Sequence, residues 1–381
     1  MKLRTFSDIL EIRSGRNQKD VLNPNGKYPI LGSAGKVMGY ADKFICEENT
    51  TIIGRKGTIN NPMLIREKFW NVDTAFGLHA LNELDKKYLF YFCQSFDFTK
   101  LDKGSGRPSL VKSDLLKIKM YCPEIDEQKQ IVEILDTAFE AIEKAKTNLE
   151  KNLKNTKELF DSKLNEIFSQ KGEGWEEKTL GEVCSVLNGY AFKSNDVIEN
   201  SNTQLVRMGN LYQNKFNLDR KTVFYPDSFT KKYSEYLLEE GDLIMSLTGT
   251  VGKRDYGYTV EVPSLKVKLL LNQRIMKISI RDVHRLNKSY LHFLLLSPFF
   301  LEKLFKTANG TRQANLSSRT ILMLKIFIPI SINEQLKIVK KLRMLKQQTK
   351  QLEQKYQQKL DNLEELKKSL LQKAFSGELI N

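Results

Sequence analysis

Residues 104–135 read GSGRPSLVKSDLLKIKMYCPEIDEQKQIVEIL, and residues 309–342 read NGTRQANLSSRTILMLKIFIPISINEQLKIVKKL. Both stretches contain, in the same order, a polar loop with an arginine, a leucine, an apolar strand, a proline, Glu-Gln and Ile-Val. Pro123 matches Pro329 at an offset of 206 residues, whereas Gln128 matches Gln335 at 207, which indicates one inserted residue in the turn. Self-similarity at a long fixed offset predicts a chain built from two similar halves.

The repeat extends in both directions. Phe168-Ser169 matches Phe375-Ser376 at the same offset of 207, and residues 4–15 resemble residues 178–189 at an offset of 174. Because the two offsets differ, the segments between the matched stretches must differ in length. We therefore expect each half to consist of one divergent domain followed by one similar tail.

Both tails have the apolar spacing of a long helix. Residues of each stripe recur mostly at steps of three and four, and neither run contains a proline or glycine, which predicts two helices of about 65 Å at 1.5 Å per residue. The stripes are Ile131, Leu135, Ala138, Ile142, Ala145, Leu149, Leu153, Phe160, Leu164 and Ile167, and Ile338, Leu342, Leu345, Thr349, Leu352, Tyr356, Leu360, Leu363, Leu366 and Leu370.

A long helix with a single apolar stripe needs a partner. Two separate homo-oligomeric zippers would satisfy the pattern, but two copies in one chain favour an antiparallel pair related by a pseudo-two-fold axis. The predicted fold class is α+β, with two mixed α/β domains separated by a long antiparallel two-helix coiled coil. We place the domains at residues 1–124 and 172–331 and the helical segments at 125–171 and 332–381.

Charge points to a polyanionic partner. The 381 residues include 61 Lys and Arg against 46 Asp and Glu, for a net charge of +15, with 40% hydrophobic residues, enough for domain cores. Segment 1–124 carries 20 basic and 14 acidic side chains, and segment 172–331 carries 22 and 16. Since the two predicted domains are equally basic, nucleic acid is the first partner to consider, although membrane surfaces and phosphoproteins also attract basic chains.

A glycine-containing polar turn follows a short apolar strand in each predicted domain. Gly-Thr recurs in both turns, and glycine allows close backbone approach while Arg, Lys, Thr and Asn donate to phosphates and base edges. The candidate DNA contacts here are Arg55, Lys56, Thr58 and Asn60, and Thr248, Thr250, Lys253 and Arg254. A hairpin turn with solvated charges is the alternative interpretation.

Two further kinds of segment are candidates. The polar loops 104–109 and 309–315 contain Arg107 and Arg312, which suit a phosphate clamp or, equally, a loop that caps the helical rod. In the second domain Tyr190, Lys193 and Arg274 belong to stretches that mix aromatic, amide and basic groups. These side chains could contact bases or serve packing.

Motifs for catalysis are missing. No G-x-x-x-x-G-K-[ST] phosphate loop, N-P-P-aromatic methyltransferase motif or acid-x-Lys nuclease centre occurs. The four cysteines form no C-x-x-C pair and are expected to be buried thiols, and the three histidines have no partner cysteines for a metal. No signal peptide or membrane span is present in the sequence, so a cytoplasmic location is expected.

At this point the pattern resembles a known family, the specificity subunits of type I restriction-modification systems. The resemblance covers essentially the whole length and includes the two strand-plus-Gly-Thr segments. Its other motif residues are Pro123, Glu127, Gln128, Ile131, Val132, Phe168 and Ser169, and Pro329, Glu334, Gln335, Ile338, Val339, Phe375, Ser376 and Gly377.

The resemblance implies a non-catalytic chain with two target recognition domains. Each would bind a short half-site in the major groove, and the helical rod would fix the spacer of a bipartite DNA target. Two modification subunits carrying S-adenosylmethionine would dock along the rod, and restriction subunits using ATP with Mg would join them. This chain itself would hold no cofactor.

Other interpretations remain. The chain could serve a related methyltransferase-nuclease system, contain a cryptic enzyme, or be a coiled-coil scaffold that binds nucleic acid through bulk charge.

The second helix is more basic than the first, with Arg343 and Lys346, so the two docking faces are not expected to be equivalent.

Overall fold

The computed structural model describes residues 3–33, 35–310 and 313–380. The chain divides into two compact units, and each combines one globular domain with parts of both long helices. Unit 1 is Met1–Lys151 with Tyr356–Asn381, and unit 2 is Asn152–Lys355.

The first repeat forms short strands and helices before one long helix. In chain order these are β1 (Leu3–Thr5), α1 (Phe6–Ile9), β2 (Leu10–Ser14), β3 (Tyr28–Leu31), β4 (Val37–Ala41), β5 (Thr50–Gly54), β6 (Met63–Ile65), β7 (Trp70–Asn71), β8 (Ala75–Ala80), α2 (Lys86–Ser95), η1 (Phe98–Leu101), α3 (Lys112–Leu115), β9 (Lys119–Tyr121) and α4 (Ile125–Ser169).

The second repeat follows the same plan with insertions. Its elements are β10 (Trp175–Thr179), α5 (Leu180–Val183), β11 (Cys184–Asn188), η2 (Ser194–Asp196), β12 (Thr203–Val206), η3 (Met208–Asn214), α6 (Phe229–Lys232), η4 (Ser234–Tyr236), β13 (Leu237–Leu238), β14 (Leu243–Ser246), β15 (Thr248–Thr250), β16 (Thr259–Glu261), β17 (Lys268–Leu271), β18 (Ile275–Ile280), α7 (Lys288–Leu296), α8 (Pro298–Lys306), β19 (Gln313–Asn315), α9 (Ser318–Leu322), β20 (Lys325–Pro329) and α10 (Ile332–Ser376).

The start of each repeat folds by the same local chemistry. Thr5 and Asp8 form a capping box at α1, and Thr179 and Glu182 form one at α5. Hydrogen bonds from Thr5 lower the pKa of Asp8, and hydrogen bonds from Thr179 lower that of Glu182. These strand-turn-strand units lie at the offset of 174 residues that the sequence shows.

Equivalent sheets form the centre of each domain. The four-stranded order is β2-β8-β5-β6 in unit 1 and β11-β18-β14-β16 in unit 2, and every pairing in both is antiparallel. Smaller sheets, β4-β3-β7 and β12-β17-β13, each contain one parallel pair. The central strands β5 and β14 are buried throughout, because both faces of each are covered.

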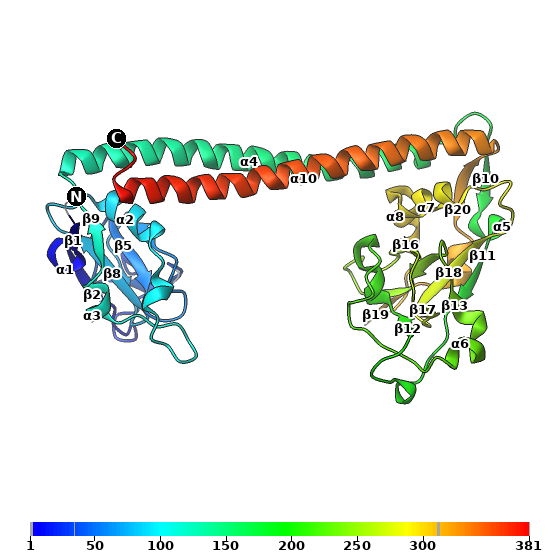
Figure 1. The fold of residues 1–381 in the computed structure, drawn as a ribbon, viewed down its shortest axis with the longest axis horizontal. Helices are drawn as coiled ribbons and strands as arrows, with labels where there is room; N and C mark the ends of the chain where they lie inside the picture. Colours follow the sequence, from blue (N-terminus) through cyan, green and yellow to red (C-terminus); the bar gives the residue numbers. More distant parts are fainter. Residues whose placement is uncertain (1–2, 34, 311–312, 381) are drawn as a thin grey trace. The chain divides into compact units, whose positions relative to one another are not determined.

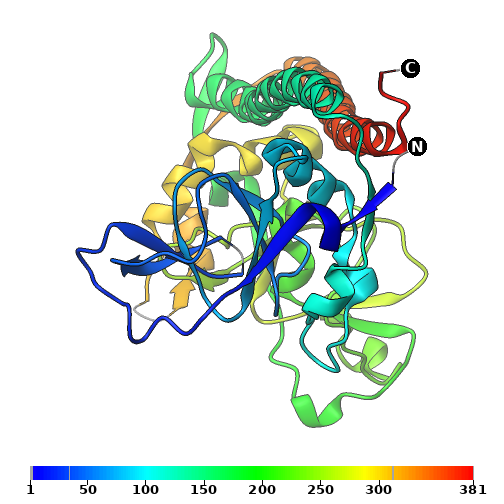
Figure 2. The same ribbon diagram turned by 90° about the vertical axis from the view of Figure 1, so that its left-hand side faces the viewer.

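In unit 1 the beginning of α4 and the end of α10 share one core. Leu371 and Ala374 of α10 are buried together with Ile131 and Leu135 of α4. The Lys146 ammonium donates to Glu364 at 2.9 Å across the two helices, which lie side by side in Figures 1 and 2. Since the beginning of one helix meets the end of the other, the pairing is antiparallel.

Unit 2 contains the converse arrangement. Leu164 and Phe168 near the end of α4 are buried in one core with Val339 and Leu342 near the beginning of α10. Helices α7 and α8 lie against this part of the helix pair (Figure 1). The predicted α+β fold with an internal repeat and an antiparallel helix pair is confirmed.

The predicted apolar stripe is right for α4 and partly wrong for α10. Leu352 is 38% exposed and Leu366 is 47% exposed. The buried face instead passes through the half-buried Glu353 and Lys367, because consecutive four-residue steps shift the stripe by one position. Between Leu153 and Phe160, where the α4 stripe skips one step, Thr156 is buried and its hydroxyl donates to the Asn152 carbonyl.

A buried glutamine anchors the start of each long helix. Gln128 accepts from the backbone N–H of Asp85 at 2.8 Å and donates to the carbonyls of Glu83 and Pro123. In the second repeat Gln335 accepts from the N–H of Asn287 and donates to the carbonyls of Arg285 and Pro329. The repeated Glu-Gln motif therefore fixes each long helix to the cap of a short helix, α2 or α7.

The remaining sequence expectations concern cysteines and membranes. All four cysteines are free and buried, as predicted, and burial raises the pKa of the Cys46 and Cys184 thiols to about 12. In the described part of the chain, no helix has the length and apolar character needed to span a bilayer.

Candidate nucleic-acid interface

Backbone hydrogen bonds join four loops of unit 1 into one surface. The N–H of Arg16 donates to the carbonyl of Asn71, and that of Arg55 to the carbonyl of Thr74, at 3.0 and 2.8 Å. The N–H of Gly57 donates to the carbonyl of Pro108, and Lys56 forms a β-bridge with Ser109. We call this set, residues 15–16, 55–58, 73–74 and 107–109, the four-loop surface of unit 1.

Unit 2 contains the same four loops with the same connections. The N–H of Tyr190 donates to the carbonyl of Leu271, and that of Leu247 to the carbonyl of Arg274, both at 2.9 Å. Strand β15 pairs with β19, which places Thr248 opposite Asn315 as Lys56 is placed opposite Ser109. The four-loop surface of unit 2 is residues 189–190, 247–250, 273–274 and 313–315.

The strand-turn segments and the polar loops were separate sequence predictions, and the structure brings them together in both repeats. The matching is residue by residue, since Leu110 donates to the Arg55 carbonyl at 2.8 Å and Leu316 donates to the Leu247 carbonyl at 2.8 Å. The same surface is therefore built twice from loops that are distant in sequence.

Cationic groups dominate the surface of unit 1. Lys56 and Arg107 are exposed, while Arg55 is half-buried and its Nη1 donates to the Asp73 carbonyl at 3.4 Å. Gly57 has φ +85°, and a Cβ there would lie 2.8 Å from Nη2 of Arg107, so the guanidinium lies directly against this glycine. Such a group of donors suits phosphates and base edges.

The other two candidates of unit 1 differ. Thr58 is exposed beside Gly57. The Asn60 side chain accepts from the N–H of Phe98 at 2.9 Å and donates to Asp97 at 3.3 Å. Asn60 therefore supports the start of η1, and contact with DNA would require it to leave these bonds.

In unit 2, Tyr190 belongs to an aromatic cluster at the four-loop surface. Its ring is 37% exposed and lies 4.8 Å from that of Tyr233 and 5.0 Å from that of Phe192. A hydrogen bond with Tyr233 raises the pKa of Tyr190. Arg274 is exposed next to it, since Gln273 donates to the Tyr190 carbonyl at 3.0 Å.

The threonines of the unit 2 turn have local partners. The Thr248 hydroxyl is buried and donates to Sδ of Met208 at 3.1 Å. The Thr250 hydroxyl donates to Asp255 at 2.8 Å. Asp255 thus closes the turn, and although burial acts to raise its pKa, the hydrogen bonds from Thr250 lower it overall.

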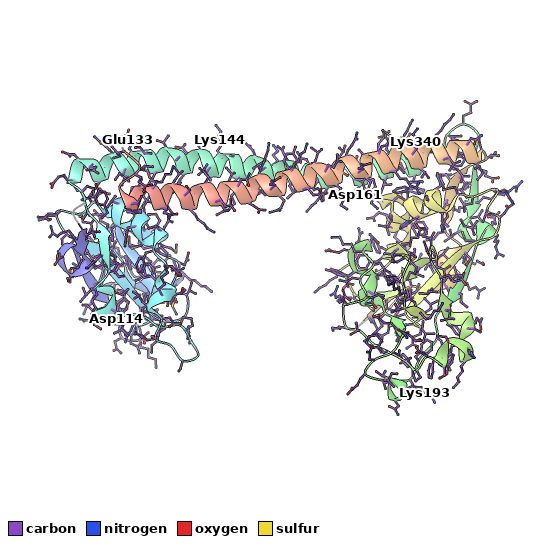
Figure 3. The ribbon with its side chains drawn as sticks, viewed as in Figure 1. Asp114, Glu133, Lys144, Asp161, Lys193 and Lys340 are labelled. Carbon is purple, nitrogen blue, oxygen red and sulfur yellow. The ribbon has the colours of Figure 1, made fainter. Side chains whose placement is uncertain are left out.

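The remaining candidates lie at the margins of the surface or outside it. Arg254 pairs with Glu302 through Nη1 and Nη2, and its guanidinium lies 5.1 Å from the centre of the Phe305 ring, whereas Lys253 is exposed. Figure 3 shows Lys193 at the edge of unit 2 remote from α10, and its carbonyl accepts from the Tyr225 hydroxyl. Arg312 lies outside the described residues.

Three residues of the unit 1 surface were missed by the sequence predictions. Arg16, Asp73 and Thr74 occupy the places that Tyr190, Gln273 and Arg274 hold in unit 2. The sequence contained a signal for Arg16 alone, because the offset of 174 residues matches it with the candidate Tyr190.

The histidines take structural positions where their contacts are described. Nδ1 of His79 lies 3.2 Å from the Thr50 hydroxyl, and Nε2 of His292 lies 3.3 Å from the Thr259 carbonyl. Burial lowers the pKa of both imidazoles. Among residues 3–33, 35–310 and 313–380, no group of three or more His, Cys, Asp or Glu side chains could hold a metal ion.

The fold is duplicated, and each repeat contains an equivalent four-loop surface. The chain matches the type I restriction modification DNA specificity domain over residues 1–151 and again over residues 172–362. It belongs to this family.

Named relatives agree with this assignment. The specificity subunit of the type I restriction enzyme MjaVIII from Methanocaldococcus jannaschii is 28% identical over 368 residues, which cover 89% of this chain and 85% of that protein. The EcoAI specificity subunit of Escherichia coli is 29% identical over 164 residues, which cover 43% of this chain and 27% of that protein.

Solved structures show the same fold. A structure described as the basis of complex assembly and conformational transition of the type I R-M system gives a TM-score of 0.77 at 18% identity, covering 99% of this chain and 98% of the other. The HsdS subunit from Thermoanaerobacter tengcongensis gives 0.61 at 17% identity, covering 99% and 97%.

The chain is therefore the DNA-recognition subunit of a type I restriction-modification complex. It is a non-catalytic subunit that assembles with modification and restriction subunits and with DNA.

Proposed function

We propose that each four-loop surface recognises one half of a bipartite DNA target. The observation that carries the proposal is that one backbone framework is built twice with different side chains. Arg16, Arg55 and Asp73 in unit 1 correspond to Tyr190, Leu247 and Gln273 in unit 2. The same framework with different side chains suits two half-sites of different sequence.

Within each surface, different residues are assigned different tasks. Lys56 and Arg107 are exposed cations and suit phosphates, which contribute affinity without sequence information. In unit 2, Arg274 and Tyr190 suit base edges, and Lys253 and Lys193 suit the phosphates beside them.

We further propose that two modification subunits dock along the outer faces of α4 and α10. Glu133 and Lys144 project from α4 away from the sheets of unit 1, and Lys340 projects correspondingly from α10 in unit 2 (Figure 3). At the offset of 207, Glu133 corresponds to Lys340 and Glu143 to Lys350. The two docking faces therefore differ in charge, and binding of the two subunits should differ in salt dependence.

The cofactors in this proposal belong to the partners. The modification subunits would use S-adenosylmethionine to methylate flipped adenines, and restriction subunits would use ATP with Mg. The contribution of this chain is binding and orientation of the DNA.

The test is to co-express the chain with its modification subunits and map methylated adenines across DNA. One motif with two fixed halves supports the proposal.

Changing Lys56 and Arg107 together to Ala should weaken binding to all duplexes and make the slope of log K against log salt shallower by about two. Binding that falls smoothly with salt, with no base change costing about 1–3 kcal/mol, would instead identify a non-specific scaffold.

A further inference from the structure

We propose that Asp73 and Arg55 of unit 1 together recognise a single C·G base pair of the target. This inference rests on the proposed function, because it takes the four-loop surface as the part that meets DNA. It goes further by assigning one base pair to two named side chains.

Arg55 is held in place before any DNA arrives. Its guanidinium lies 5.6 Å from the centre of the Phe76 ring, and its Nη1 donates to the Asp73 carbonyl at 3.4 Å. Its backbone N–H is bonded to Thr74 and its carbonyl to Leu110. A half-buried arginine fixed at both ends loses little freedom on binding, which suits a directional contact with a base better than a contact with a mobile phosphate.

Asp73 is the acidic residue of this surface, and in the described part of the chain its carboxylate does not stabilise the fold through a contact of its own. It is exposed on the short connection between β7 and β8, and within the described ranges no hydrogen bond or ion pair involves its carboxylate. A free carboxylate on a surface that also contains Arg16, Arg55 and Lys56 repels phosphates, so it weakens non-specific binding. It is useful on a DNA-binding surface if it accepts a hydrogen bond from an exocyclic amine.

A C·G pair offers the matching groups on one edge. In the major groove cytosine presents its N4 amino group to a carboxylate, and the paired guanine presents O6 and N7 to a guanidinium. Because Arg55 contacts the backbone of Asp73 itself, the two groups belong to adjacent points of one surface and can address both bases of one pair.

Unit 2 cannot make this pair of contacts. Gln273 occupies the place of Asp73, and an amide suits adenine. Leu247 occupies the place of Arg55, and its side chain is only 7% exposed because it is packed in the core. The proposal therefore assigns the C·G requirement to one half of the target only.

The experiment compares methylation motifs in the full complex. Asp73→Asn is expected to lower the preference for C·G at one position of one half-site by about 5- to 150-fold, with the other half unchanged. Arg55→Ala is expected to relax the same position and also to weaken binding. Circular dichroism checks that both variants are folded.

Glu67→Gln is the matched control, since it removes the same charge by the same chemistry. Glu67 is exposed and comes two residues after Ile65, which pairs with Thr50 at the opposite end of β5 from the Gly57 turn. It should leave the motif unchanged.

Two results would overturn the proposal: an unchanged motif in Asp73→Asn, or relaxation at different positions in the Asp73 and Arg55 variants. In either case the Lys56 and Arg107 variants still report on the four-loop surface. If they also leave binding unchanged, the failure belongs to the proposed function.

Discussion

Gln128 and Gln335 show how a single side chain can organise a junction. Each amide satisfies three backbone groups at the point where a strand gives way to a 45-residue helix. Both side chains are 0% exposed, so bulk water does not reach the backbone groups that the amide bonds.

Gln128→Ala should therefore lower the free energy of unfolding of unit 1 by about 3 kcal/mol, because it leaves buried N–H and C=O groups without partners. Urea unfolding followed by tryptophan fluorescence in a Trp175→Phe background measures this, since Trp70 then reports on unit 1 alone. Gln130→Ala, at an exposed position of the same helical turn, is the control and should have little effect. Equal stability of the two variants would contradict the role assigned to Gln128.

Gly57 provides a second prediction at this scale. A side chain at φ +85° is strained, and its Cβ would press on the Arg107 guanidinium. Gly57→Ala should lower the free energy of unfolding by about 1 kcal/mol and weaken DNA binding by the complex. Fluorescence anisotropy with a duplex that contains the motif found by methylation mapping measures the binding. Gly106→Ala, whose Cβ would meet nothing within 4 Å, should bind as the parent does. A parent-like Gly57→Ala would show that Arg107 does not depend on this turn.

At the scale of elements, the helix pair shows which apolar positions matter. Leu342 is 1% exposed in the core of unit 2, whereas Leu352, which the sequence pattern places on the same stripe, is 38% exposed. Both positions are leucines on the predicted stripe, so the sequence pattern does not distinguish them. They differ only because the buried face of α10 includes Leu342 and not Leu352.

Leu342→Asp should destabilise unit 2 by several kcal/mol, because it buries a carboxylate without a partner. Leu352→Asp should change the melting temperature little. Thermal unfolding followed by circular dichroism compares the two directly. A large loss in Leu352→Asp would mean that this leucine is covered in solution.

Local signals explain why many elements could be predicted. The two long helices depend on the spacing of apolar residues close in sequence, and the duplication is visible as matching residues at fixed offsets. Arg55, Lys56, Thr58 and Arg107 were candidates one by one, but their assembly into one surface with Asp73 and Thr74 depends on hydrogen bonds between segments distant in sequence, so it could not be predicted. The use of Asn60 by Phe98, 38 residues away, is likewise set by tertiary structure.

For the whole molecule, the helices continue from one unit into the other, as the bounds of α4 and α10 show. If their length sets the spacer of the DNA target, adding one heptad to both should lengthen it. Seven residues add about 10 Å, or about three base pairs at 3.4 Å each. Insertions after Lys151 and Lys355 that preserve the apolar stripe, followed by methylation mapping, provide the measurement. Unaltered spacing would exclude the helices as the determinant.

The shared cores have a consequence for the ancestry of the chain. Unit 1 contains Leu371 and Ala374, which lie at the far end of the sequence, so the first repeat alone lacks part of its own interior. Two identical single-repeat polypeptides could supply this missing part to each other by exchanging helix ends. Such a homodimer would recognise a palindrome, and duplication and fusion of its gene followed by divergence would yield an asymmetric target.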